Sequence, residues 1–154
     1  MVDIIFPSIF TRTDMHGLVH HIELYVSDLP ASTAFWSWLL TEKFSYTVYQ
    51  KWNKGISFKL HDTYIVLVQT EARYLDIPYH RKRSGLNHLA FHCESREFVD
   101  TLAGELRDKG IAILYADTHR NTEDYHAIYF EDPDRIKVEL VTHPNRSEEH
   151  RHDR

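Results

Sequence analysis

Two short stretches of this chain, VHHIELYV at residues 19–26 and NHLAFHCE at residues 87–94, resemble one another. Both alternate apolar and polar side chains, which is the pattern of a β-strand with one buried face. Each stretch places a histidine at the same point, His21 in the first and His88 in the second. Such self-similarity predicts an internal duplication, and a duplication decides the architecture before any local propensity does.

The segments that follow the two stretches repeat the same order of elements. The two histidines are 67 residues apart, and YIVLV (64–68) precedes KVELV (137–141) by 73 residues, so one loop absorbs the difference. In each copy, apolar residues at helical spacing come next, and three runs with the composition of β-strands follow them. These runs are 44–50, 55–60 and 64–69 in the first copy and 111–116, 126–131 and 136–141 in the second. The sequence therefore predicts two β-α-β-β-β modules, over residues 18–70 and 86–142.

Each predicted helix has recognisable ends and an apolar stripe. The first helix begins at SDLP (27–30) and the second follows Ser95, while Gly110 stands where a glycine C-cap would. We expect the stripes to pack against the apolar faces of the strands. The stripe residues are Ala34, Phe35, Trp38 and Leu39 in the first helix, and Phe98, Val99, Leu102 and Leu106 in the second.

Length and composition indicate one globular domain. A chain of 154 residues with 42% hydrophobic residues buries roughly two-thirds of its unfolded surface. No apolar run approaches the roughly 20 residues of a membrane span, and the start of the chain lacks a secretion signal. The single Cys93 excludes an intramolecular disulfide. We therefore expect a cytoplasmic protein without a membrane partner.

The N-terminal segment is expected to be either an arm that packs on a partner subunit or a loose extension, and the charge argues against nucleic acid as a partner. Residues 1–17 are expected to form an N-terminal extension, and residues 143–154 a flexible polar tail. A net charge of −5 argues against a nucleic-acid partner, which needs a concentrated basic face. The only basic cluster, HRKR at 80–83, is interpreted as a solvated loop.

The strand faces decide which polar side chains share a surface. Side chains alternate across a strand, so His21 and Glu23 lie on one face of the first stretch. His88 and His92 lie on the corresponding face of the second stretch, and Glu139 on that of KVELV. All five side chains are expected on the side away from the helices, where a curved sheet would form a cup.

Residues 18–142 resemble the vicinal oxygen chelate superfamily, which includes glyoxalase I, fosfomycin-resistance thiol transferases, extradiol dioxygenases and bleomycin-binding proteins. The motifs that carry the resemblance are HIELYVSDLPASTAFW, LNHLAFHCES and YFEDPDRIKVELV, in this order. The resemblance implies an α+β fold, with tandem βαβββ modules curled as a mixed sheet around a metal-binding cup and helices on the outside. It also implies a homodimer.

The same resemblance implies that His21, His88 and Glu139 bind one divalent metal ion, which could be Fe, Mn, Zn, Ni or Co. One position departs from glyoxalase I, where a glutamate occupies the last strand of the first module. By our alignment Val66 stands there, and valine cannot coordinate a metal. Two imidazoles and one carboxylate would leave coordination positions open for water or a substrate.

We expect a metal-dependent enzyme acting on a small substrate that chelates through neighbouring oxygens. Lyase or isomerase chemistry is favoured slightly over thiol transfer, and extradiol cleavage is less favoured. Glu23 or His92 would act as the catalytic base, although Glu23 could instead pair with Lys137. The alternative function is a non-catalytic binding protein of the antibiotic-resistance type that uses the same cup. Tyr125, His126 and Tyr129 could form a polar rim around the cup or could be ordinary packing residues.

Overall fold

The computed structural model describes residues 16–116, 122 and 125–142, and the expectations for residues 1–15 and 143–154 fall outside them. The first module contains two helical segments and four strands in the order β1, α1, π-helix, β2, β3, β4. Their bounds are β1 His21–Val26, α1 Leu29–Ser37, the π-helix Trp38–Lys43, β2 Thr47–Trp52, β3 Gly55–Leu60 and β4 Thr63–Gln69. A short 3-10 helix, Ala72–Tyr74, follows. The second module comprises β5 His88–Cys93, α2 Arg96–Asp108, β6 His126–Glu131 and β7 Lys137–Thr142.

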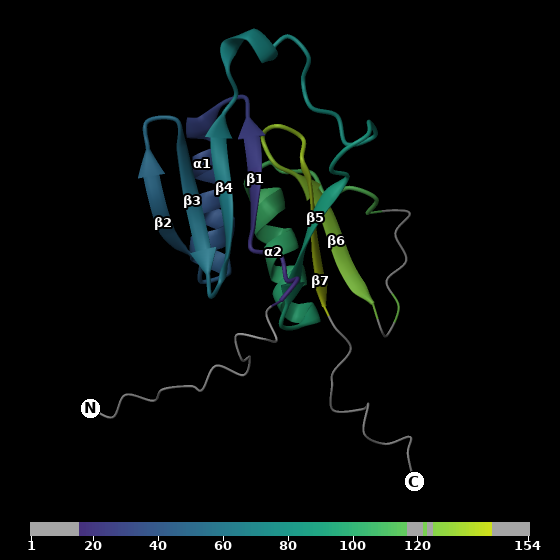
Figure 1. Cartoon of the computed structure of the whole chain (residues 1–154). Helices are drawn as coiled ribbons and strands as arrows, with labels where there is room; N and C mark the ends of the chain where they lie inside the picture. The colour runs from purple at the N-terminus through teal and green to yellow at the C-terminus, as the bar shows by residue number, and fades with distance from the viewer. Residues whose placement is uncertain (1–15, 117–121, 123–124, 143–154) are drawn as a thin grey trace, which may run out of the picture.

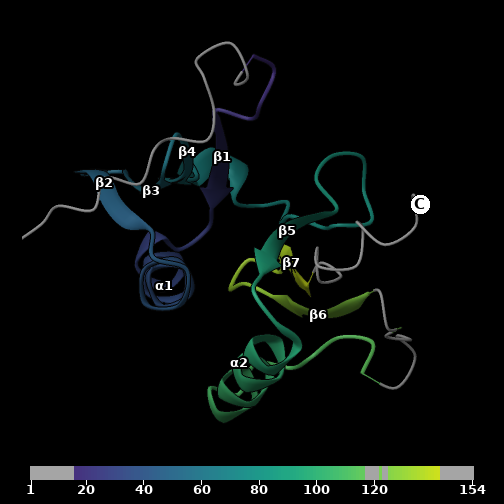
Figure 2. The ribbon, with the colours of Figure 1, turned by 90° about the horizontal axis from the view of Figure 1, so that it is seen from below.

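The strands form two sheets, one for each module (Figure 1). The first has the order β1-β4-β3-β2 and the second the order β5-β7-β6. Figure 2 shows both helices on the same side of the sheets, with β1 and β5 as the adjoining edges. The predicted α+β class and modular duplication are confirmed. In the described part of the chain, no helix is long and apolar enough to cross a membrane.

The strand register supports the duplication residue by residue. In each module the first strand pairs in parallel with the last: β1 with β4, and β5 with β7. Val66 lies opposite Glu23 in the first pair, and Glu139 lies opposite Ala90 in the second. Val66 and Glu139 therefore occupy equivalent positions, as the sequence alignment predicted.

The second module lacks one predicted strand. The run 111–116 makes only an isolated bridge, between Leu114 and Tyr129, in which the Leu114 amide donates to the Tyr129 carbonyl at 2.7 Å. The next residue, Tyr115, has φ +60°, a left-handed conformation that a bulky side chain rarely adopts. This turn takes the chain away from β6, so the ladder ends after one pair.

The helix ends follow the expected capping chemistry. The Ala31 amide donates to the Asp28 side chain at 3.0 Å, and the Phe98 amide donates to the Ser95 hydroxyl at 3.1 Å. Each contact satisfies one backbone donor that a helix start leaves free. Gly110 has φ +76°, the left-handed conformation typical of a glycine that ends a helix.

The apolar stripe of the first helix is only partly as predicted. Trp38 and Leu39 are buried, but Ala34 is exposed, and the completely buried Trp36 was missed. The helix continues from Ser37 into the π-helical segment, and this wider turn changes the phase of the buried face. In α2, by contrast, Val99, Leu102 and Leu106 are buried at regular helical spacing.

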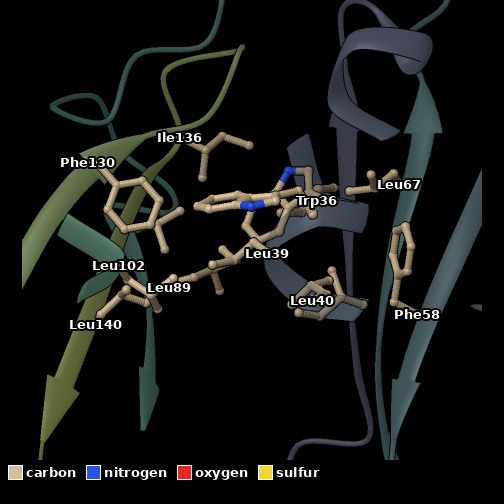
Figure 3. Packing of buried hydrophobic residues seen from close by; sticks show 14 of the residues in the cluster. Trp36, Leu39, Leu40, Phe58, Leu67, Leu89, Leu102, Phe130, Ile136 and Leu140 are labelled. Atoms are coloured by element: carbon tan, nitrogen blue, oxygen red, sulfur yellow. The ribbon is translucent and has the colours of Figure 1, made fainter. Parts of the chain in front are cut away.

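One hydrophobic core serves both modules. Figure 3 shows Trp36 and Leu39 between the two sheets, with Phe130 on the side of the second sheet and Leu67 on the side of the first. All four side chains are completely buried. Because side chains from both halves fill the same interior, neither module buries its apolar face alone.

A buried carboxylate joins the modules at one end of this core. Asp132, in the turn between β6 and β7, is 5% exposed and accepts a hydrogen bond from the Trp36 indole N–H at 3.0 Å. Its other oxygen accepts from the amides of Asp134 and Ile136 at 2.9 and 2.8 Å. The Ser27 amide, at the end of β1, donates to Asp134 at 2.9 Å. Burial raises the pKa of Asp132 to about 6, although the hydrogen bonds from Ile136 and Trp36 oppose the shift.

We predict that Trp36→Phe destabilises the protein by about 1–3 kcal/mol at roughly pH 8 and by less at roughly pH 5. A raised pKa means that the contribution of Asp132 to stability is fully present below pH 3.8 and is lost as the pH rises through about 6. The indole bond counters this loss because it stabilises the ionised carboxylate. Urea unfolding at both pH values measures the difference.

Trp38→Phe is the matched control, since the Trp38 indole N–H makes no hydrogen bond within the described residues. Its cost should be independent of pH over the same range. An equal cost of Trp36→Phe at both pH values would contradict the assigned role of the indole–carboxylate bond.

Candidate metal centre

The face of the second sheet away from α2 carries the strongest group of polar side chains. His88 on β5 and Glu139 on β7 approach each other, with His88 Nε2 at 3.0 Å from Glu139 Oε2. The His88 side chain is 36% exposed and that of Glu139 only 7%. The structure thus brings together two of the three predicted metal ligands.

The orientation of His88 follows from its neighbour Asn87. The Asn87 amide nitrogen donates to the carbonyl of Arg81 at 3.0 Å, so the amide oxygen faces the other way. This oxygen lies 2.8 Å from His88 Nδ1, and the contact is a hydrogen bond only if Nδ1 carries the proton. In a neutral imidazole with its proton on Nδ1, the Nε2 lone pair faces the carboxylate.

The donor set fits a divalent cation. A neutral imidazole lone pair and a carboxylate oxygen are both electron-pair donors, and facing each other at 3.0 Å they need a positive charge between them. Two ligands bound at about 2.1 Å, and at roughly a right angle, lie about 3 Å apart. A proton on Nε2 would meet the same need.

Two phenols hold the other oxygen of the carboxylate. Tyr125 and Tyr129 both donate to Glu139 Oε1, Tyr129 at 3.1 Å, and the two hydroxyls lie 3.0 Å apart. Burial and the contact with Glu139 raise the pKa of Tyr125 far above its usual value. Burial likewise raises the pKa of Tyr129. The phenols therefore stay protonated and act as donors, and the polar-rim interpretation holds for these two residues.

Lys137 lies on the same face of the second sheet, two positions before Glu139 on β7. The residue is 9% exposed, and its ammonium lies over the rings of Tyr115 and Tyr129 at 5.6 and 5.5 Å from their centroids. Cation–π attraction of this kind partly offsets the cost of burying the charge. The alternative ion pair with Glu23 does not form among the described residues.

His21 lies elsewhere, on the outer face of the first sheet. Its Nδ1 is 2.9 Å from His20 Nδ1, and its ring stacks on Tyr64 at a centroid distance of 4.7 Å. Within the described residues, no three His, Cys, Asp or Glu side chains gather closely enough to hold a metal ion. One chain therefore does not bring His21 together with His88 and Glu139.

The other predicted site residues divide between the two sheets. Glu23 is exposed on β1, two positions from His21 and on the same face. His92 is exposed on β5, on the face of His88. His126 points the other way, toward α2, where its Nε2 contacts Asp100 at 2.9 Å, so it is not part of the rim. Burial raises the pKa of Cys93 to about 11, which keeps the thiol protonated and unsuited to bind a metal.

Two residues have roles that the sequence did not indicate. Arg81, in the basic run predicted as a solvated loop, is only 14% exposed and forms an ion pair with Glu131. Lys82 and Arg83 are exposed as predicted. Asn87 was not considered, although an amide directly before a candidate ligand in LNHLAF was the available signal.

Several known proteins are similar to this chain in sequence. YqjT of Bacillus subtilis, an uncharacterised protein, is 53% identical over 125 residues, covering 80% of this chain and 97% of YqjT. Glutathione transferase FosA of Serratia marcescens is 32% identical over 122 residues, covering 79% of this chain and 78% of FosA.

Solved structures are similar to this chain as well. A glyoxalase candidate from Bacillus halodurans has 48% identity and a TM-score of 0.79, covering 83% of this chain and 97% of its own. The fosfomycin resistance protein FosX of Listeria monocytogenes, in complex with Mn(II) and sulfate, has 25% identity and a TM-score of 0.61, covering 83% and 90%. The model of the glyoxalase/bleomycin resistance protein/dioxygenase superfamily matches residues 18–140. The chain belongs to this superfamily.

Proposed function

We propose that this protein is a metal-dependent enzyme that binds a small substrate through two neighbouring oxygens. The observation that carries the proposal is the approach of His88 Nε2 to Glu139 Oε2, at 3.0 Å on the outer face of the second sheet. The relatives support a metal and a transfer reaction, since FosX was crystallised with Mn(II) and FosA is a glutathione transferase. We favour lyase, isomerase or thiol-transfer chemistry.

The third ligand, we propose, is His21 of a second copy of the chain. Within one chain His21 lies on the first sheet, and His88 and Glu139 lie on the second. The outer face of the first sheet exposes Tyr25, and also Trp52, whose ring lies against Gly55. Exposed aromatic groups of this kind are typical of an interface. A homodimer that joins this face to the second sheet of its partner would complete a site of two imidazoles and one carboxylate.

Each residue of the proposed site would have its own role in the reaction. A bound divalent cation would polarise the substrate oxygens and stabilise the negative charge that develops on them. Tyr125 and Tyr129 keep Glu139 in place through their hydrogen bonds. Glu23 comes to the site with His21, and His92 with His88, so either can accept a substrate proton as a general base. A sequestering protein would need no such imidazole–carboxylate pair, so the pair favours an enzyme.

We predict that His88→Ala lowers the affinity for Mn(II) at least tenfold while leaving the unfolding transition nearly unchanged. The side chain lies on the outer face, away from the shared core. Titration of metal-free protein followed by electron paramagnetic resonance measures the affinity. His16→Ala, which removes another exposed histidine, serves as the matched control. Wild-type affinity in His88→Ala would refute the assignment.

A second prediction concerns a site shared between protomers. His21→Ala and His88→Ala homodimers should each lack an intact site, whereas a mixed dimer of the two should regain one. In that dimer the first chain supplies His88 and Glu139, and the second supplies His21. Co-expression with two affinity tags isolates the mixed dimer for metal analysis. If mixing restores no binding, the site is not shared; a monomeric wild-type protein in light scattering would also exclude it.

We also predict poor turnover of the hemithioacetal of methylglyoxal and glutathione. Val66 occupies the position equivalent to Glu139, so the first module offers no carboxylate ligand there. Spectrophotometric assay of the Mn(II)-loaded protein measures the rate, with a dedicated glyoxalase I as the reference. A comparable rate that is lost in Glu139→Gln would show that a second carboxylate, at position 66, is dispensable for this reaction.

A further inference from the structure

We propose that Asn87 is a positioning residue that fixes the proton of His88 on Nδ1 and so keeps Nε2 available as a ligand. The inference concerns the same centre as the proposed function and, for its metal-binding consequence, rests on it. The position of the proton, however, can be measured without any metal.

The contacts of Asn87 favour one orientation of its side-chain amide. Its nitrogen donates to the Arg81 carbonyl at 3.0 Å, and a flipped amide would set two oxygens against each other. The oxygen is thereby directed at His88 Nδ1, 2.8 Å away. An amide oxygen only accepts, so this contact favours the tautomer in which Nδ1 carries the proton. The hydrogen bond made by one ring nitrogen decides the protonation of the other.

The basic run at 80–83 holds this arrangement in place. The Arg81 side chain pairs with Glu131 at the end of β6, and Arg135 contacts the same carboxylate at 3.4 Å. The ion pair secures the backbone segment whose carbonyl receives the Asn87 amide. Arg81 thus links the second sheet to the orientation of a candidate ligand, whereas Lys82 stays exposed.

Removal of Asn87 has a definite consequence for the imidazole. Without an acceptor at Nδ1, the competing tautomer is favoured, in which Nε2 carries the proton and donates to Glu139 Oε2 at 3.0 Å. In this tautomer the proton occupies Nε2. A cation can bind Nε2 only if the hydrogen bond to Glu139 is lost and the proton moves to Nδ1, which then has no acceptor. Partners that orient a metal-binding histidine typically contribute 10–100-fold to metal affinity.

The test measures protonation and affinity separately. Nitrogen-15 NMR of the metal-free protein, at about pH 8 where unperturbed histidines are neutral, reports whether His88 Nδ1 carries a hydrogen. Paramagnetic resonance gives the Mn(II) affinity of the same samples. The variants are Asn87→Ala, and Asn87→Asp, which keeps an acceptor for Nδ1. Asn53→Ala, an exposed asparagine in the β2–β3 turn, is the matched control.

We expect Nδ1 of His88 to be protonated in the wild type, in Asn87→Asp and in Asn53→Ala, and unprotonated in Asn87→Ala. The Mn(II) affinity of Asn87→Ala should fall about 10–100-fold, with that of Asn87→Asp nearer to wild type. Nδ1 still protonated in Asn87→Ala would overturn the inference. Wild-type protein that binds no Mn(II), yet shows the expected protonation, would defeat the proposed function while supporting the role of Asn87.

Discussion

The hydrogen bond from the Trp36 indole to Asp132 is the constraint on which the arrangement of the two modules depends. It connects the helix of the first module to the last turn of the second, inside a core that both modules share. The same carboxylate receives two backbone amides of its own turn. Loss of the carboxylate would leave three donors without acceptors, two of them buried, so the conformation of the turn and the packing of the core are coupled.

This joint packing explains why the polar residues face outward. Both helices lie on one side of the sheets, and the apolar strand faces close against them (Figure 2). His88 and Glu139 are left on the opposite face, where nothing of the described core competes for their donors and acceptors. The side chains of the centre can therefore change with little effect on stability, while the core positions cannot. Asn87, Tyr125 and Tyr129 hold the pair from the sides rather than from the core.

Much of this organisation could be predicted from the sequence, because it depends on short periodic patterns. Alternation along β1 and β5 gave the exposed faces, and the offset between the copies gave the equivalence of Val66 and Glu139. Trp36 was missed because a π-helix changes the phase of the buried face, which regular helical spacing does not anticipate. The run 111–116 has the composition of a strand, but a left-handed residue at Tyr115 interrupts the pairing. The position of Asn87 beside His88 can be read from the sequence, but its hydrogen bond to the Arg81 carbonyl, which orients the amide, cannot.

The register of the duplicated strands also restricts how the two modules could have diverged. Each module carries one acidic side chain at the middle of its outer face, but on different strands: Glu23 on β1 and Glu139 on β7. Glu23 lies directly opposite Val66, whereas Glu139 lies opposite Ala90. A carboxylate at position 66 would meet Glu23 across the ladder, and opposed like charges destabilise a sheet. A second carboxylate ligand at position 66 would therefore cost stability unless Glu23 changed with it, so the residue opposite position 66 restricts which metal centres the first module can carry.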